Sequence, residues 1–408
     1  MELLAPAGNL EKLKYAYQYG ADAAYIGISQ FSLRAKADNF HENEWEIIKE
    51  IKGNKKLYCA LNIYFHNPDI RRLEEQLDYF EKYPFDAFIV SDIGIVPMLK
   101  RKFPNTELHL STQANCTNAE AASMYKNMGF DRVVLGREVR LDEIKEIKDK
   151  VPDLELEAFV HGAMCLAYSG RCFLSSWMTD RSANQGGCSH SCRWDYKVLE
   201  EKKRPGEYYP IYEGDGFTSI LSSKDINMIH HLMDLKMAGV DSAKIEGRMK
   251  SIYYVATVAR AYRKALDVLE GKDVPDFESY AEELDKVSHR EFSTGFYFGK
   301  EDIEKPNKEG YERYYTFLGI VGKKISEGQY ELNLKNQVLP PEELEFIGPD
   351  VLFLKDRDYT IYDVNNQVVD QADHGKQYII ETKLPLEEGY LIRRGITDKE
   401  LKFKQTSR

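Results

Sequence analysis

Residues 3–27 read LLAPAGNLEKLKYAYQYGADAAYIG, and this stretch contains one complete strand–helix–strand pattern. The short apolar runs Glu2–Ala5 and Ala23–Ile28 are typical of buried strands. Between them, Asn9–Tyr19 places its apolar residues at helical spacing. Strands that alternate with helices in this way predict a parallel sheet with helices outside it.

The same alternation continues through the first three quarters of the chain. Further strand-like runs lie at Leu57–Ile63, Ala87–Ser91, Leu108–Thr112, Arg132–Leu135, Glu155–Val160, Ser219–Leu221 and Ala243–Ile245. About eight such units in roughly 250–300 residues predict an α/β fold of the (β/α)8, TIM-like barrel type. A doubly wound open sheet is the alternative. No GxGxxG follows the first strand, which argues against a dinucleotide-binding version of it.

Two segments depart from this rhythm. Residues 163–216 lack clear periodicity and follow a predicted strand, so we expect them to project from the C-terminal face of the barrel, where barrel enzymes keep their active sites. After residue 307 the pattern changes to short strands with turn signals, at Phe317–Val321, Tyr330–Leu334, Leu344–Ile347, Tyr359–Val364 and Gln377–Glu381. We therefore expect a TIM-like barrel catalytic domain over residues 1–306, with 163–216 as a cysteine-rich loop, and a small C-terminal β-barrel domain over residues 307–408.

Composition and charge indicate a folded protein and argue against a membrane protein or a protein with a generally basic surface. Hydrophobic residues make up 43% of the 408 residues, enough for a sizeable core. The net charge of −11 means that any contact with RNA needs a local basic groove. The N-terminus lacks a signal-peptide pattern, and no apolar run approaches the ~20 residues of a membrane helix. We expect a cytoplasmic protein with no membrane partner, and in a reducing compartment clustered thiols bind metal more often than they form disulfides.

Four of the six cysteines, Cys165, Cys172, Cys188 and Cys192, lie in the loop, with the spacing C-x6-C-x15-C-x3-C. Zinc sites favour paired C-x2–4-C units, and only the second pair fits that spacing. An uneven spacing in an irregular loop also suits an iron–sulfur cluster. Spacing alone leaves zinc and iron–sulfur equally favoured, with the absence of a metal as a third interpretation. Cys59 and Cys116, on or near predicted strands, are expected to be buried core residues.

Polar residues at two strand ends are candidates for a site at the barrel mouth. Gln113 and Asn115 follow a predicted strand and are placed to hydrogen-bond a polar substrate. Arg137 and Glu138 end the next strand, where a catalytic role and an internal ion pair of the barrel rim are equally favoured.

The segment AKIEGRMKS, residues 243–251, contains further candidates at the end of the last barrel strand. Alternation puts Lys244 and Glu246 on one face, and a Lys–Glu pair inside a barrel is costly unless it is functional or fully paired. Arg248 suits a carboxylate, which a guanidinium binds through two parallel hydrogen bonds. We take these three as catalytic candidates together with Arg137 and Glu138. The substrate-binding candidates, besides Gln113 and Asn115, are Tyr168, Arg171 and His289, with a surface turn as the alternative for His289 and Arg290.

A contact with RNA is predicted on the helix Met249–Leu266. It carries basic and aromatic side chains, namely Lys250, Tyr253, Tyr254, Arg260, Tyr262, Arg263 and Lys264. The alternative, an ordinary amphipathic barrel helix, is favoured for any single one of these residues.

Several long motifs resemble one known family. They are GAMCLAYSGRCFLSSWMTDRSANQGGCSHSCRW, HLSTQANCTNAEAASMYKNMGFDRVVLGREV and HREFSTGFYFG, beginning at residues 162, 109 and 289. Together with the N-terminal stretch quoted above, they resemble the collagenase-like peptidases of unassigned catalytic type, family U32, over almost the whole chain. The β-rich tail resembles that of the subgroup that hydroxylates tRNA.

This resemblance implies a function and a set of ligands. Members of the subgroup take part in prephenate-dependent tRNA hydroxylation, which forms 5-hydroxyuridine at the wobble position, and relatives hold a [4Fe-4S] cluster. The resemblance thus implies an iron–sulfur cluster bound by Cys165, Cys172, Cys188 and Cys192, with zinc as the alternative metal. It also implies prephenate, a small dicarboxylate, as co-substrate and tRNA as partner, with a paralogue or a second copy of the chain as a further partner.

The family label makes peptidase activity the alternative function, and a non-catalytic RNA-binding role is the third. No HExxH motif and no GxSxG motif is present, and four grouped thiols do not suit a cysteine peptidase. His230 and His231 lie in a helical run and are expected on a solvated face. Ser169 and His161 remain candidates for a serine peptidase.

Overall fold

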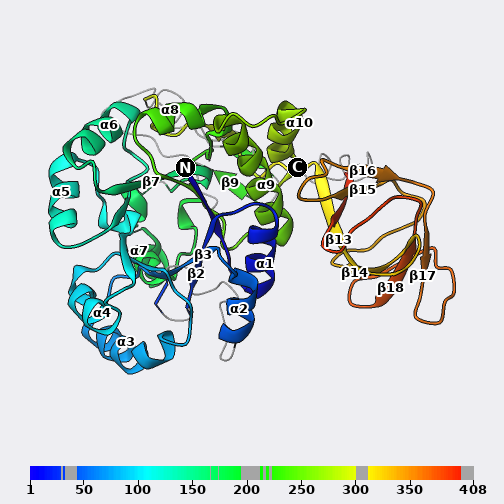
Figure 1. Cartoon of the computed structure of the whole chain (residues 1–408), viewed down its shortest axis with the longest axis horizontal. Coiled ribbons are helices and arrows are strands. Elements are labelled where there is room, and N and C mark those ends of the chain that lie inside the picture. Colours follow the sequence, from blue (N-terminus) through cyan, green and yellow to red (C-terminus); the bar gives the residue numbers. More distant parts are fainter. Residues whose placement is uncertain are drawn as a thin grey trace. The chain divides into compact units, whose positions relative to one another are not determined.

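The computed structural model describes residues 1–28, 31–32, 44–165, 167–172, 174–193, 212–214, 217–219, 223–299 and 311–396. The chain forms two compact units (Figure 1). The first comprises Met1–Val274 and His289–Glu312, and the second comprises Pro275–Ser288 and Arg313–Arg408. The domain boundary expected at residues 306–307 lies outside the described residues.

The first unit contains a closed barrel of eight parallel strands, as the sequence predicts. In order around the ring these are β1 (Glu2–Pro6), β2 (Ala23–Gly27), β3 (Lys56–Leu61), β4 (Ala87–Val90), β5 (Glu107–Leu110), β6 (Arg132–Val134), β7 (Glu155–Ala163) and β11 (Ser242–Ile245). Strand β11 pairs with both β7 and β1, and this double pairing closes the ring. The doubly wound alternative is therefore wrong.

Helices surround the ring of strands, as Figure 1 shows. They are α1 (Leu10–Gln18), α2 (Trp45–Lys52), α3 (Asn67–Phe80), α4 (Val96–Lys102), α5 (Ala119–Asn127), α6 (Leu141–Lys150), α8 (Leu232–Met237) and α9 (Ile252–Leu269). The first of them begins where the sequence predicts, because the Asn9 side chain accepts a hydrogen bond of 2.9 Å from the backbone N–H of Lys12.

Of the strand expected at Ser219–Leu221, only Ser219 lies among the described residues, and it is not part of the barrel. The chain there forms β9 (Phe217–Ser219), which pairs with β8 (Tyr212–Gly214) in a separate two-stranded sheet. Strand β10 (Asp225–Asn227) instead runs antiparallel to the last residues of β7, and β12 (Phe292–Ser293) pairs beside it. These two short strands support the end of β7, from which the cysteine-rich loop departs.

A charged network lies inside the barrel. Glu157 on β7 has no solvent exposure, and its carboxylate binds Lys244 Nζ at 2.6 Å and Arg132 Nη1 at 3.0 Å. Arg132 also reaches Glu2 and Glu155, each at 2.6 Å. Burial by itself would raise the pKa of the Glu157 carboxyl, but the two cations outweigh it and lower this pKa to about 2. The network therefore joins β1, β6, β7 and β11 through one ionised carboxylate.

The second unit is a seven-stranded antiparallel sheet around its own apolar core. Its strands are β13 (Tyr315–Ser326), β14 (Gln329–Leu334), β15 (Leu344–Ile347), β16 (Leu354–Asp356), β17 (Thr360–Tyr362), β18 (Gln377–Glu381) and β19 (Leu391–Gly395). The sequence did not predict β16 or β19. Helix α10 (Phe277–Ala281) and the following turn belong to this unit, because the fully buried Arg393 on β19 binds Glu283 at 2.7 Å.

The Glu157→Gln substitution tests the barrel network. We expect it to destabilise the first unit by about 3 kcal/mol at neutral pH, because Lys244 then lies buried without its carboxylate. The folded pKa of about 2 lies below the ~4.3 of an unfolded glutamate, so the carboxylate stabilises the fold above pH ~4.3. The difference between wild type and variant should shrink as the pH falls from there towards 2.

Urea unfolding at a series of pH values measures this difference. Tryptophan fluorescence reports the first unit, because all three tryptophans of the sequence precede residue 275 and the second unit therefore contains none. The control is Glu120→Gln, which removes a largely exposed carboxylate of the first unit and should change stability by less than about 1 kcal/mol. A difference between wild type and Glu157→Gln that stays constant from neutral to low pH would contradict the interpretation.

Candidate active site

The ends of β6 and β11 bring one ion pair to the barrel mouth. Arg137 follows β6 and Glu246 follows β11, and Nη2 of the arginine lies 3.4 Å from Oε2 of the glutamate. The guanidinium carbon of Arg137 also lies 3.7 Å from the centroid of the Phe159 ring. Arg137 Nε is buried and has no hydrogen-bond partner within the described part of the chain. The arginine is therefore only partly satisfied, with spare capacity for an anion.

Arg248 lies buried in the mouth on the other side of β11. Its guanidinium carbon lies 5.8 Å from the centroid of the Tyr25 ring. A Cβ atom on Gly27 would lie 2.1 Å from Nη1 of Arg248, so only glycine at the end of β2 leaves room for this guanidinium. Arg248 therefore lies beside the end of β2, and its role in binding a carboxylate stays a prediction.

Lys244 differs from what simple alternation suggests. Its ion pair is with Glu157 at 2.6 Å, whereas the ion pair of Glu246 is with Arg137. The β7–β11 register shifts between Lys244 and Ile245, which interrupts the alternation at this point. Lys244 Nζ also lies 4.5 Å from the centroid of the Tyr25 ring. Lys244 therefore belongs to the charged network inside the barrel. It does not form an ion pair with Glu246 at the barrel mouth.

The cysteine-rich loop is docked onto the mouth by residues that were predicted to bind substrate, together with Glu138, which was predicted to be catalytic. The Ser169 hydroxyl lies 2.9 Å from Oε2 of Glu138 and 2.7 Å from Oδ1 of Asn115, and Ser169 is 1% exposed. Arg171 Nε donates to the backbone carbonyl of Gln113 at 2.9 Å. Glu138, Asn115 and Gln113 therefore hold the loop. Glu138 contacts Ser169 and Arg137 pairs with Glu246, so the alternative of an Arg137–Glu138 ion pair is wrong, and a catalytic role for the two residues stays a prediction.

Other contacts fix the interior of the loop around the cysteines. Asn184 accepts from the backbone N–H of Cys172 and donates to its carbonyl, both at 3.2 Å, while its own carbonyl accepts from the backbone N–H of Tyr64 at 3.0 Å. Arg181 Nη2 donates to the carbonyl of Cys188 at 3.3 Å. Asn184 thus couples one cysteine directly to the barrel, a role that its sequence context did not indicate.

None of the four loop cysteines, all of which lie among the described residues, forms a disulfide. Cys165 is exposed, and Cys172, Cys188 and Cys192 are partly buried. Among the described residues, no three His, Cys, Asp or Glu side chains are arranged to hold a metal ion. Four thiols on one docked loop are nevertheless the donor set that iron–sulfur clusters use, and zinc accepts the same set. The donors fit either group in their chemistry, but they are not preassembled in this structure.

The remaining cysteines are core residues, as predicted. Cys59 and Cys116 are both fully buried. Burial raises the pKa of the Cys59 thiol, and it raises the pKa of the Cys116 thiol to about 11. Both side chains are therefore neutral thiols at physiological pH and are unsuited to act as nucleophiles.

The turn alternative for His289 and Arg290 is wrong, because both side chains are buried. His289 stacks on Phe292, with ring centroids 4.2 Å apart. Arg290 forms an ion pair with Asp225 at 2.7 Å. His289 therefore packs behind the loop and has no solvent-facing surface for a substrate.

The described residues do not form a peptidase constellation. The Ser169 hydroxyl contacts a carboxylate and an amide, whereas His161 Nδ1 lies 3.4 Å from the Tyr262 hydroxyl. Burial lowers the pKa of the His161 imidazole to about 3. His230 is exposed, and His231 pairs with Asp234 at 3.1 Å, so the expected solvated face is confirmed.

Helix α9 is largely an ordinary barrel helix. Tyr253, Tyr254, Arg260 and Tyr262 are all buried, so for these four residues the favoured alternative of an ordinary barrel helix is confirmed. Only the start of the helix differs, because Lys250 lies 4.6 Å from the centroid of the Tyr311 ring, which is 47% exposed.

With this geometry in hand, the comparison with known proteins is decisive for the family. The sequence profile of peptidase family U32 matches residues 8–307, and the profile of the family's C-terminal domain matches residues 313–393. The chain belongs to peptidase family U32. No helix among the described residues is long and apolar enough to span a membrane.

Three curated relatives illustrate the range of names within the family. The chain is 41% identical to the tRNA hydroxylation protein P1 of Bacillus subtilis (strain 168), across 94% of this chain and 92% of the relative. It is 38% identical to the tRNA hydroxylation protein P of Escherichia coli (strain K12), across 85% and 86%. It is also 31% identical to a protein named collagenase from Porphyromonas gingivalis (strain ATCC BAA-308 / W83), across 94% of each.

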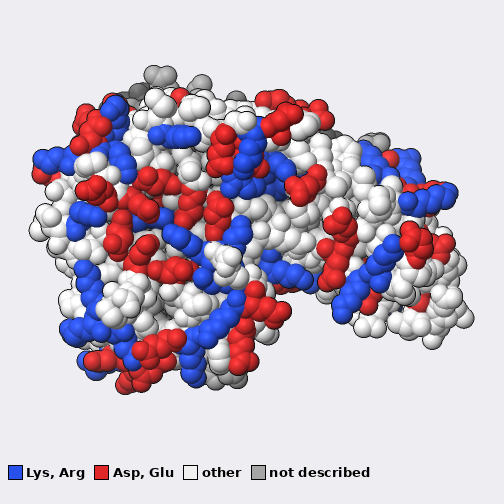
Figure 2. Space-filling model, viewed as in Figure 1, with Lys and Arg blue, Asp and Glu red and all other residues white. Residues whose placement is uncertain are grey.

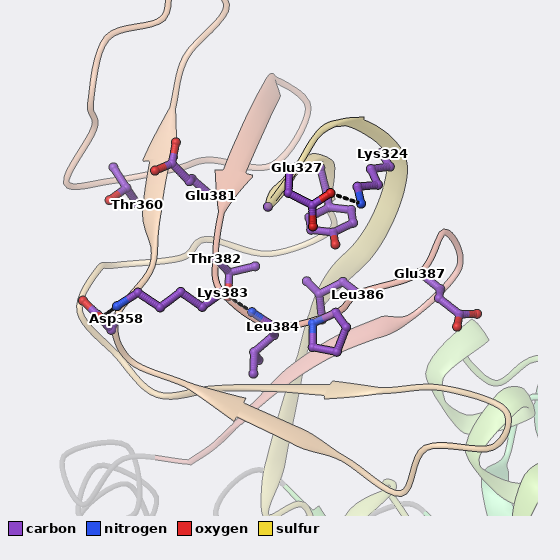
Figure 3. A pocket seen from close by; sticks show the side chains of 13 residues that line it. Lys324, Glu327, Asp358, Thr360, Glu381, Thr382, Lys383, Leu384, Leu386 and Glu387 are labelled. Carbon is purple, nitrogen blue, oxygen red and sulfur yellow. Dashed lines mark hydrogen bonds and ion pairs between the residues drawn. The ribbon is translucent and has the colours of Figure 1, made fainter.

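A groove in the second unit was not predicted (Figure 3). Its two lysines are already engaged, Lys324 with Glu327 at 2.9 Å and Lys383 with Asp358 at 2.8 Å. Glu381 and Glu387 line the same groove. Its acidic lining does not suit a phosphate backbone, so the barrel mouth is the better candidate for the active site.

The Ser169→Ala substitution tests how the loop is docked. We expect amide hydrogens of residues 167–172 to exchange about tenfold faster, because the loop loses its hydroxyl contacts with Glu138 and Asn115. Ser182→Ala is the matched control in the same loop, since the Ser182 side chain forms no capping hydrogen bond. Hydrogen exchange with mass spectrometry measures both variants. Equal protection in Ser169→Ala and wild type would show that these contacts do not hold the loop.

Proposed function

We propose that this chain hydroxylates tRNA, forming 5-hydroxyuridine at the wobble position, with prephenate as co-substrate and an iron–sulfur cluster as cofactor. The observation that carries the proposal is the docking of a four-thiol loop onto a barrel mouth that also contains Arg137 and Arg248. The relatives named tRNA hydroxylation proteins, at 41% and 38% identity, support the same reaction.

In this proposal the cysteine-rich loop holds the cofactor. Cys165, Cys172, Cys188 and Cys192 would each supply one thiolate to a [4Fe-4S] cluster, which supplies electron transfer when bound. The contacts of Ser169 and Asn184 orient the loop so that its thiols stay close to the mouth. Zinc remains the alternative metal.

The barrel mouth would bind the small dicarboxylate. Arg137 keeps hydrogen-bonding capacity at a buried nitrogen, and Arg248 is held in a slot that a side chain at residue 27 would fill. Guanidinium groups bind carboxylates through two parallel hydrogen bonds, and burial strengthens such contacts. Glu246, paired to Arg137 at 3.4 Å, would orient this arginine and compete with the incoming carboxylate.

The RNA would approach a small part of the surface. Acidic and basic side chains are interspersed on the face of the molecule in Figure 2, in line with the net charge of −11. Beside Arg248, the chain presents Met249, which is 52% exposed, and Lys250 next to the exposed ring of Tyr311. An exposed aromatic ring beside a cation suits a stacked base and its phosphate, and the wobble base is unpaired in free tRNA.

Peptidase activity is the alternative function, supported by the family label and by the relative named collagenase. No contact in the described structure favours it, because Ser169 and His161 have separate partners. A non-catalytic RNA-binding role would leave the buried arginines of the mouth without a ligand to bind.

Cofactor binding is tested by Cys172→Ser. Anaerobically purified wild-type protein should contain about four iron and four sulfide per chain and absorb near ~400 nm. Cys172→Ser should lose most of this iron, because one of the four thiolates is gone. Cys59→Ser should retain it, since Cys59 is a buried core residue. Full iron retention in Cys172→Ser, or zinc in place of iron in the wild type, would contradict the assignment.

The reaction is tested by mass spectrometry of tRNA nucleosides. A strain that lacks this gene and any paralogue should lose 5-hydroxyuridine and the nucleosides derived from it, and the wild-type gene should restore them. Arg248→Lys should restore about a tenth or less, because lysine keeps the charge but lacks the planar fork. Unchanged nucleosides in the deletion strain would reject tRNA hydroxylation, and full restoration by a folded Arg248→Lys protein would reject the arginine's role.

A further inference from the structure

The end of β7 is fastened by a buried group that neither the barrel nor the proposed reaction uses. Arg290 is 2% exposed, and its Nε and Nη2 lie 2.8 and 2.7 Å from the same carboxylate oxygen of Asp225. Asp225 is 1% exposed and lies on β10, opposite Ala163 at the end of β7. This ion pair therefore lies where the barrel strand becomes the cysteine-rich loop.

Two donors of this group converge on one carbonyl. Arg290 Nη2 donates to the backbone carbonyl of Met164 at 3.3 Å, and the Ser223 hydroxyl donates to the same oxygen at 2.8 Å. Arg290 Nη1 in turn donates to the Ser223 hydroxyl at 3.2 Å. Met164 is 4% exposed, whereas the next residue, Cys165, is exposed. The carbonyl immediately before the first loop thiol is thus held by two chain segments.

We propose that Arg290, Asp225 and Ser223 form a latch that positions Cys165 for cofactor binding. Arg290 and Ser223 do not touch the thiol, so they are positioning residues. Their contacts set where the chain leaves β7 and so restrict where the Cys165 thiol can lie. Groups that orient a ligand without binding the metal commonly change metal affinity by 10–100-fold when they are altered. This inference rests on the proposed function, in which Cys165 is a cluster ligand.

The alternative is that this ion pair only stabilises the fold. A buried ion pair broken on one side costs stability wherever it lies, so loss of stability cannot separate the two roles. The chain contains a matched comparison in Arg132, which is also 2% exposed and paired with carboxylates but lies in the barrel network. If Arg290 positions Cys165, substitution of Arg290 should weaken cofactor binding, whereas substitution of Arg132 should lower stability without weakening cofactor binding.

The experiment compares the full-length variants Arg290→Lys and Arg132→Lys after anaerobic reconstitution with iron and sulfide. Release of iron to a chelator is followed by absorbance near ~400 nm, at a temperature below the unfolding midpoint of both proteins. Lysine cannot span Asp225, Ser223 and the Met164 carbonyl at once, so Arg290→Lys should release iron about tenfold faster than wild type. Arg132→Lys should release it at the wild-type rate.

Ser223→Ala provides a second, milder variant in case Arg290→Lys does not fold. It removes one of the two donors to the Met164 carbonyl and should speed iron release by about threefold in a folded protein. Equal release rates in wild type, Arg290→Lys and Ser223→Ala would overturn the latch alone. A wild-type protein that binds no cluster would overturn the proposed cofactor and the latch with it.

Discussion

The ionised carboxylate of Glu157 has no contact with solvent, so the surrounding barrel strands must supply the cations that pair with it. An isolated carboxylate in this position would cost several kcal/mol, so Lys244 and Arg132 must both lie beside it. Lys244 is on β11 and Arg132 on β6, the two neighbours of β7 in the ring. Because Arg132 also binds Glu2 on β1, a shift of register at the closure would break several ion pairs at once. The constraint therefore fixes the four strands that close the barrel.

The candidate site stands directly above these four strands. Strand β6 continues into Arg137, and β11 continues into Glu246 and Arg248. Strand β7 continues into the cysteine-rich loop, which returns to the mouth through Ser169. The functional side chains therefore come from strands whose register the charged network sets. The loop is held by a separate set of polar contacts, made by Ser169 and Arg171.

Sequence patterns predicted the architecture because it follows from short-range signals. Buried parallel strands are apolar runs, and the first helix begins at a capping asparagine, so the barrel and the loop were visible without coordinates. The sequence did not predict which charged residues pair with one another, because this depends on the register between strands that are distant in the sequence. Lys244 pairs with Glu157 rather than Glu246, since the register shifts after Lys244. Strand β19 was not predicted for a related reason. Its two arginines interrupt the apolar pattern of a buried strand, and the burial of Arg393 depends on its distant partner Glu283.

The sequence predicted the place of a site residue where that place depends on an adjacent strand. It did not predict contacts with residues that are distant in the sequence. Arg248 follows β11, a strand that the sequence identifies, so its place in the chain could be predicted although its role stays a prediction. Gln113, Asn115 and Glu138 were placed at the mouth but hold the loop, a function that requires knowing where Ser169 and Arg171 return. His289 was misjudged because its burial depends on β12 pairing beside β10, a contact between segments about 65 residues apart.

The central claim is that the docked loop holds an iron–sulfur cluster at a barrel mouth containing two arginines. Anomalous diffraction at the iron absorption edge, from crystals grown anaerobically, tests it most directly. The account predicts one iron-containing peak bound by Cys165, Cys172, Cys188 and Cys192, with Arg137 and Arg248 facing the space beside it. Protein that is active in tRNA hydroxylation but shows no iron at these four thiols would contradict the account.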